Sequence, residues 1–197
     1  MYYVRMGAAI GRLEKMREAV AYLHKALAIG EEIKNETIIA YACTWLILHY
    51  ADLGQMDDAI IMGKKVQAMR LFDEDETVFR LSMASIAYAY YFKGNARQAY
   101  EAGNMLLEYG RGRGSMGCVV HGYTCRAFGH LVRGDYPSAI GCLREAIAAA
   151  TEPLYGYTAK IMLGLTYVSN NQFVEADDIL HEITQYHERH GYGLVGT

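Results

Sequence analysis

The chain repeats itself every 40 residues, and this period constrains the fold more than any other feature. Five segments align from Glu14, Gly54, Gly94, Gly134 and Asn171, so the spacings are 40, 40, 40 and 37 residues. Five residues into each segment lies an alanine, at Ala19, Ala59, Ala99, Ala139 and Ala176. Such a period indicates one supersecondary unit per repeat, which buries its apolar face only by stacking on its neighbours.

Each repeat is predicted to be a helical hairpin. Apolar residues recur at spacings of three and four, which gives one buried stripe per helix. Glycine at the turn favours the left-handed conformation that ends a first helix, and Asn171 is the usual substitute. Residues that favour the N-cap precede three of the following first helices, at Asn35, Asp75 and Ser115. No stretch alternates like a β-strand, so we expect an all-α solenoid of about five hairpins.

Composition narrows the class of protein. The 197 residues are 52% hydrophobic with 2 prolines, which is typical of an ordered, helix-rich chain. A net charge of -3 argues against a general nucleic-acid binder. The longest nearly apolar run, 38–51, is too short to span a bilayer, and the first residues do not resemble a secretory signal, so we expect none. The 4 cysteines form no C-x-x-C pair, so we expect reduced thiols and a cytoplasmic location. From the charge and the short apolar run we expect neither membrane nor nucleic-acid partners.

Within a repeat, a small residue, an aromatic or imidazole ring, the turn residue, a second ring and the alanine follow in a fixed order. This order resembles that of the tetratricopeptide repeat (TPR) family. One repeat shows it at Ala127, His130, Gly134, Tyr136 and Ala139. The period is longer than the usual 34 residues and is similar to that of maltose-regulator-like bacterial signalling proteins. Segments such as "YYFKGNARQAYEAGNMLLEYG" and "YVSNNQFVEADDIL" resemble the C-terminal arrays of bacterial proteins that combine a class III adenylate or guanylate cyclase domain with an ATPase domain.

That resemblance implies a right-handed α-α superhelical solenoid and a non-catalytic role in protein–protein interaction. It implies one TPR-like domain over 1–197, with repeats roughly at 1–34, 35–74, 75–114, 115–151 and 152–197. Neither end shows a polar cap, and "HGYGLVGT" would normally lead into another repeat. We therefore expect a fragment of a longer array, or ends covered by a partner, and predict a homodimer or end-to-end oligomer.

In such arrays the first helix of each repeat lines the concave surface. Alignment with the TPR family gives eight residues at the positions that line this surface, and we take them as candidates for a partner-binding groove: Tyr41, Thr44, Leu48, Tyr88, Tyr91, His121, Thr124 and Phe128. The row continues in the last repeat with Thr158, Ile161, Leu165 and Val168. Because this row is apolar and aromatic and lacks a run of Lys and Arg, it favours a hydrophobic peptide or helix. Packing between helices is the alternative interpretation for about half of these residues.

The stretch "GRGRGSMG" (110–117) contains a formal G-x-G-x-x-G match. A dinucleotide fingerprint needs a strand before the glycines, whereas a helical segment precedes them here. Alignment of the repeats places the stretch between two hairpins, at the same position as "LFDEDET" (71–77). Both segments are therefore expected to be solvated connectors. Arg111 and Arg113 with free amides at a helix N-terminus remain a possible anion contact.

No catalytic, cofactor or metal site is expected. His181, His187 and His190 lie near one another in sequence, but no cysteine or carboxylate completes a set of ligands at suitable spacing. Cys118 and His121 lack an orienting third group, and no G-x-S-x-G is present. The alternative to a protein-interaction module is a regulatory domain that senses a small molecule in a pocket between helices.

Overall fold

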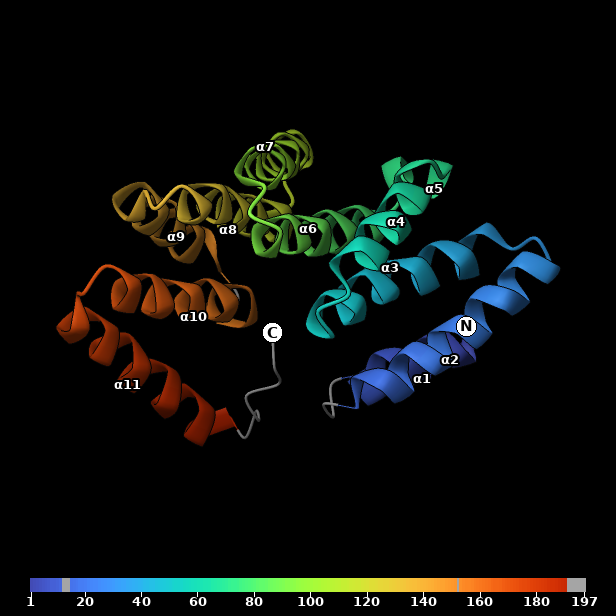
Figure 1. Cartoon of the computed structure of the whole chain (residues 1–197), viewed down its shortest axis with the longest axis horizontal. Coiled ribbons are helices and arrows are strands. Elements are labelled where there is room, and N and C mark those ends of the chain that lie inside the picture. Colours follow the sequence, from blue (N-terminus) through green and yellow to red (C-terminus); the bar gives the residue numbers. More distant parts are fainter. Residues whose placement is uncertain (12–14, 152, 191–197) are drawn as a thin grey trace. The chain divides into compact units, whose positions relative to one another are not determined.

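The computed structural model describes residues 1–11, 15–151 and 153–190. These residues form eleven α-helices and no strand, so the predicted all-α fold is confirmed (Figure 1). In chain order the helices are α1 (Tyr2–Gly11), α2 (Met16–Glu32), α3 (Glu36–Asp52), α4 (Met56–Gln67), α5 (Arg70–Glu74), α6 (Glu76–Phe92), α7 (Ala96–Arg113), α8 (Met116–Val132), α9 (Tyr136–Ala149), α10 (Pro153–Ser169) and α11 (Phe173–His190). None of the described helices combines the length and the apolar character that a membrane span needs.

The chain divides into two compact units. In the first unit, Met1–Ala89, each of α1 to α4 packs against the next helix, and α1 also contacts α3. In the second unit, from Tyr90 onward, α7 to α11 pack in the same sequential way, and α8 also contacts α10. Both units therefore use the same hairpin arrangement, in which a first helix contacts its own second helix and the first helix of the next repeat. The expectation of a single domain over 1–197 stays a prediction.

The turns within the hairpins confirm the glycine and asparagine prediction. The backbone φ angle is positive at Gly54 (78°), Gly94 (70°), Gly134 (71°) and Asn171 (59°). The residue after each of these turns donates its N–H to the carbonyl of the ring residue four positions before the turn, at Tyr50, Tyr90, His130 and Tyr167. This six-residue closure satisfies carbonyls that the end of a helix would otherwise leave unpaired.

The three predicted N-caps are also confirmed. Side-chain oxygens of Asn35, Asp75 and Ser115 accept hydrogen bonds from backbone N–H groups three residues later, at Ile38, Val78 and Cys118. Each cap satisfies one of the free donors at the start of a helix. The first helices α3, α6 and α8 therefore begin where the sequence places them.

Small residues bring neighbouring helices into close contact. The repeated alanines Ala19, Ala59, Ala99 and Ala139 are fully buried. Between α7 and α8 the backbones approach more closely still, because a Cβ at Gly103 would lie 2.7 Å from the backbone nitrogen of Arg126 and 2.7 Å from the carbonyl oxygen of Gly122. At position 103, no side chain larger than that of glycine fits without moving the two helices apart.

Two connectors differ from the sequence-based expectation. Helix α7 continues to Arg113, so Gly110 and Gly112 lie inside a helix, and only Gly114, with φ of 68°, ends it. The segment 71–77 was expected to be a solvated connector, which is wrong in part, because α5 occupies most of it. The physical reason is Phe72, which is 5% exposed and packs its ring 4.9 Å from that of Phe79.

Candidate functional site

In the first unit, the predicted groove residues of α3 are largely engaged within the fold. Thr44 is buried and its hydroxyl donates to the Ala40 carbonyl at 2.8 Å. Tyr41 is half-buried and its hydroxyl donates to Asp75 Oδ2 at 2.9 Å, and burial together with this bond raises its pKa. Leu48 is half-buried. Tyr41 thus joins α3 to the N-cap of α6, which is a structural role alongside the predicted binding role.

Among the groove residues of α6 and α8, the structure brings Tyr91 and Phe128 together. Their rings stack with centroids 5.2 Å apart, which leaves Phe128 only 5% exposed. Thr124 is buried and donates to the Val120 carbonyl at 3.0 Å. His121 and Tyr88 are half-buried; the His121 ring lies edge-on to Tyr155 at 6.1 Å. Partner binding by the eight groove candidates stays a prediction.

The row of predicted groove positions on the first helices is exposed to solvent at α10. Ile161, Leu165 and Val168 line an apolar groove of about 510 Å³ together with residues of α11. Leu165 is 56% exposed, although its counterpart one repeat earlier is the buried Phe128. The α11 side contributes Phe173, Ala176, Asp177, Ile179, Leu180, Ile183 and Thr184. Asp177 is the one charged side chain among the described residues that line this groove, which we call the α10–α11 groove.

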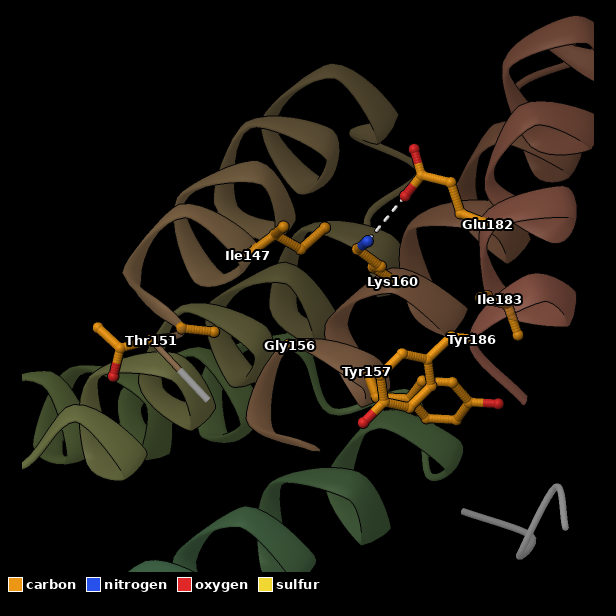
Figure 2. Close-up of a pocket in the computed structure, with 9 residues that line it drawn as sticks. Ile147, Thr151, Gly156, Tyr157, Lys160, Glu182, Ile183 and Tyr186 are labelled. Atoms are coloured by element: carbon orange, nitrogen blue, oxygen red, sulfur yellow. Dashed lines mark hydrogen bonds and ion pairs between the residues drawn. The ribbon is translucent and has the colours of Figure 1, made fainter. Parts of the chain in front are cut away.

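A second, smaller pocket of about 360 Å³ lies between the end of α9, the start of α10 and the end of α11 (Figure 2). Lys160 Nζ pairs with Glu182 Oε2 at 2.7 Å along one side. The rings of Tyr157 and Tyr186 pack 5.6 Å apart on another side. The Tyr157 hydroxyl is buried and has no hydrogen-bond partner among the described residues. A buried donor without a partner is uncommon, and it marks this pocket for a ligand or an ordered water.

The pocket lies at the end of the fourth repeat, the one with the 37-residue spacing. Helices α7 and α9 begin at the same repeat position, but α7 has 18 residues and α9 has 14. At the equivalent repeat position of α7, Arg111 donates from Nη2 to the hydroxyl of Tyr123 in α8 at 3.0 Å. The fourth repeat has the short Thr151 in the place of Arg111. The shortened spacing was the sequence signal for the pocket, although its lining residues were not predicted.

The two arginines proposed as an anion contact are exposed but already engaged. Arg111 donates to Tyr123 as described, and Arg113 donates from Nη1 to the Tyr109 hydroxyl at 3.0 Å with its guanidinium 4.5 Å from the ring centre. Both contacts leave other N–H groups of the guanidinium available. An anion contact at this place stays a prediction.

The described part of the chain contains no group of three or more His, Cys, Asp or Glu side chains placed to hold a metal ion. His181 lies against Gln185, with 2.7 Å between their Nε2 atoms. The side chains of His187 and His190 are outside the described residues. Burial raises the pKa of the Cys43 thiol to about 11 and that of Cys125 further, which disfavours the nucleophilic thiolate at neutral pH.

Comparison with known proteins identifies the fold. No model of a protein family matches the chain, and no curated protein matches it. Two crystal structures of nearly identical TPR-like repeats, from a kinesin light chain candidate of Podosopora anserina, are similar over almost the whole chain. The fold is TPR-like. One of these structures, of a variant with a single substitution, is 18% identical with a TM-score of 0.63, and covers 98% of this chain and 96% of its own. The other is 17% identical with a TM-score of 0.61, and covers 96% and 95%.

Proposed function

We propose that this chain is a non-catalytic protein-interaction module that binds a helix or peptide in the α10–α11 groove. The observation that carries the proposal is the exposed apolar lining of this groove, in which Leu165, Phe173 and Leu180 are 56%, 62% and 60% exposed. Contiguous exposed apolar surface with a groove shape is characteristic of sites that bind another macromolecule. The TPR-like fold supports the proposal because such arrays hold helices at fixed spacing and present extended surfaces.

Hydrophobic burial gives the expected strength of binding. Complete burial of one Leu or Phe side chain stabilises by roughly 1.5–3 kcal/mol. Somewhat more than half of the surface of Leu165, Phe173 and Leu180 is still exposed and available for burial by a partner. Its burial would contribute about 3–5 kcal/mol in total, before the entropic cost of association is subtracted. Association itself costs roughly 4–15 kcal/mol, so a stable complex needs contacts from the partner beyond these three anchors.

A library of helical peptides displayed on phage and selected against the purified chain tests this function. Selected peptides should shift the amide and methyl NMR signals of Ile161, Leu165 and Val168. Leu165→Asp should weaken binding at least tenfold, by loss of an anchor and burial of a charge. Ile61→Asp is the matched control, because Ile61 is 57% exposed but belongs to α4. Absence of any specific peptide, or shifts confined to other helices, refutes the proposed groove.

A second candidate function is the sensing of a small molecule in the pocket of Figure 2. The unpartnered Tyr157 hydroxyl supports it, since a ligand with a carbonyl or other acceptor would satisfy that donor. A metabolite screen by thermal shift should then find a compound that raises the melting temperature of the chain. The same compound should lose its effect on Tyr157→Phe. A screen without hits, or with hits that Tyr157→Phe does not alter, argues against this candidate.

We further propose that the module is the regulatory repeat region of a cytoplasmic bacterial signalling protein. The resemblance of the repeat segments to cyclase-linked arrays supports this proposal. The full reading frame of the gene tests it: cyclase and ATPase domains in the same protein are expected, and their absence contradicts it. The predicted homodimer or end-to-end oligomer is tested separately by light scattering on the purified chain, where a strict monomer at high concentration contradicts it.

A further inference from the structure

The pocket between α9, α10 and α11 (Figure 2) lies where a pair of packed residues differs from the preceding repeat. In the alignment of the repeats, Gly156 of α10 corresponds to Val119 of α8, and Ala150 corresponds to Gly110. Between α7 and α8 the Val119 side chain packs on Gly110, where an added Cβ would lie 2.9 Å from Val119 Cγ2. Between α9 and α10 the pair is Ala150 and Gly156, and both line the pocket. The side chain that packs at the earlier place is therefore absent beside this pocket.

Two charged side chains, Lys160 and Glu182, line this pocket among the residues that the structure describes. Lys160 Nζ lies 2.7 Å from Glu182 Oε2, and both side chains remain partly exposed. The contact uses one of the three N–H donors of the ammonium and one of the two oxygens of the carboxylate, so each group can bind a further partner. The lining thus carries no net charge, but it presents a positive and a negative group side by side.

This ion pair determines which charges a ligand can carry. A ligand with a single charge is attracted by one member of the pair and repelled by the other, and at a separation of 2.7 Å these two Coulomb energies largely cancel. A zwitterion that lies antiparallel to the pair places its carboxylate beside Lys160 and its ammonium beside Glu182, so both contacts are attractive. Charge-assisted hydrogen bonds of this kind are about twice as strong as neutral ones. The pair therefore favours a ligand whose ammonium and carboxylate lie close together, as they do in an α-amino acid.

The rest of the pocket fits the side chain of such a ligand. In Figure 2 the ion pair and the rings of Tyr157 and Tyr186 lie at different ends of the pocket. The two rings, together with Ile147 and Ile183, offer an apolar and aromatic surface on which a further ring can pack. A volume of about 360 Å³ is near the lower end for ligand pockets, so it suits a molecule of the size of an amino acid.

We propose that this pocket binds a free aromatic α-amino acid, with its carboxylate on Lys160, its ammonium on Glu182 and its ring against Tyr186. This inference rests on the second candidate function, the sensing of a small molecule at Tyr157, and specifies the ligand. A hydroxyl at the far end of the ligand's ring can accept a hydrogen bond from the buried Tyr157 hydroxyl, which has no partner among the described residues. L-Tyrosine carries all of these groups and is therefore the probe.

Three compounds with the same phenol ring test the charged end of the ligand. They are L-tyrosine, tyramine, which lacks the carboxylate, and para-hydroxyphenylpropionate, which lacks the ammonium. Binding of each compound to the full chain is followed by ligand-detected NMR titration. L-Tyrosine should bind, and each singly charged compound should bind about tenfold more weakly, because it loses one charge-assisted hydrogen bond and meets a like charge.

Variants of the ion pair assign the two contacts. Glu182→Gln should weaken the binding of L-tyrosine about tenfold and strengthen that of para-hydroxyphenylpropionate, whose carboxylate no longer meets a like charge. Lys160→Gln should likewise weaken L-tyrosine and strengthen tyramine. Glu145→Gln is the matched control, because Glu145 is exposed at the same repeat position on α9 and does not line the pocket. Ala150→Gly with Gly156→Val introduces the residue pair found between α7 and α8, and should abolish binding while the helical circular dichroism is kept.

Equal affinity of the three compounds, failure of L-tyrosine to bind, or equal effects of Glu145→Gln and Glu182→Gln overturns the inference. If a metabolite of another charge raises the melting temperature and needs Tyr157, while L-tyrosine does not bind, small-molecule sensing stands and the inference about its ligand fails. If no compound binds, L-tyrosine included, both fail. Binding that survives Ala150→Gly with Gly156→Val places the ligand outside this pocket and also overturns the inference.

Discussion

Replacing Gly103 by alanine should destabilise the chain, although alanine favours a helix by about 1 kcal/mol over glycine. The added Cβ would lie 2.7 Å from two backbone atoms of α8, whereas ordinary contact begins at 3.4 Å. Helices α7 and α8 would have to separate by about 0.7 Å, since no side chain can rotate away to make room. Overpacking of this kind costs roughly 1–3 kcal/mol, so we expect a net loss of up to about 2 kcal/mol.

Gly112→Ala is the matched control, because Gly112 lies in the same helix and a Cβ there would meet nothing within 4 Å. This substitution should stabilise the chain by roughly 0.5–1 kcal/mol. Urea unfolding followed by circular dichroism at 222 nm measures both, with the midpoints compared at an unchanged slope. If Gly103→Ala raised the midpoint as much as Gly112→Ala does, the close packing of α7 on α8 would be refuted.

Three further substitutions or titrations probe the fold. Asp75→Ala removes an N-cap and the acceptor of Tyr41, and should cost about 1–2 kcal/mol in urea unfolding, most of which Asp75→Asn should restore. Asn171→Gly should raise the free energy of unfolding slightly and Asn171→Ala should lower it by about 1 kcal/mol, measured by thermal unfolding, because φ is 59° there. Burial raises the pKa of Cys43 from 9.0 to about 11, and that of Cys125 further. Because unfolded thiols ionise first, the free energy of unfolding should fall between about pH 9 and 11, and a constant value there would contradict this.

The parts of the fold that depend on local physics could be predicted from the sequence. Glycine or asparagine at each turn and the cap residues at Asn35 and Ser115 act through the backbone within a few residues, so their roles can be read without a structure. The short helix α5 could not be predicted in this way. It depends on Phe72 packing against Phe79, which is a contact with another helix.

The alignment of the repeats also could not show which predicted groove positions on the first helices are exposed and which are buried. Leu165 and Phe128 share one repeat position, yet Phe128 is covered by the Tyr91 ring and Leu165 is exposed. The pocket at Tyr157 was missed for a related reason, since it is lined by Thr151 where the preceding repeat has Arg111 in contact with Tyr123. In both places the surface depends on which neighbouring side chain is present, and the repeat pattern does not specify that.

Amide hydrogen–deuterium exchange with and without a saturating groove-binding peptide tests the central claim most directly. Peptides selected from the helical library serve for this measurement. The α10–α11 groove predicts slower exchange confined to α10 and α11, because a docked helix there covers these segments and suppresses their local opening. Protection of α3 and α8, with α10 and α11 unchanged, would contradict the claim and place binding elsewhere on the first-helix row.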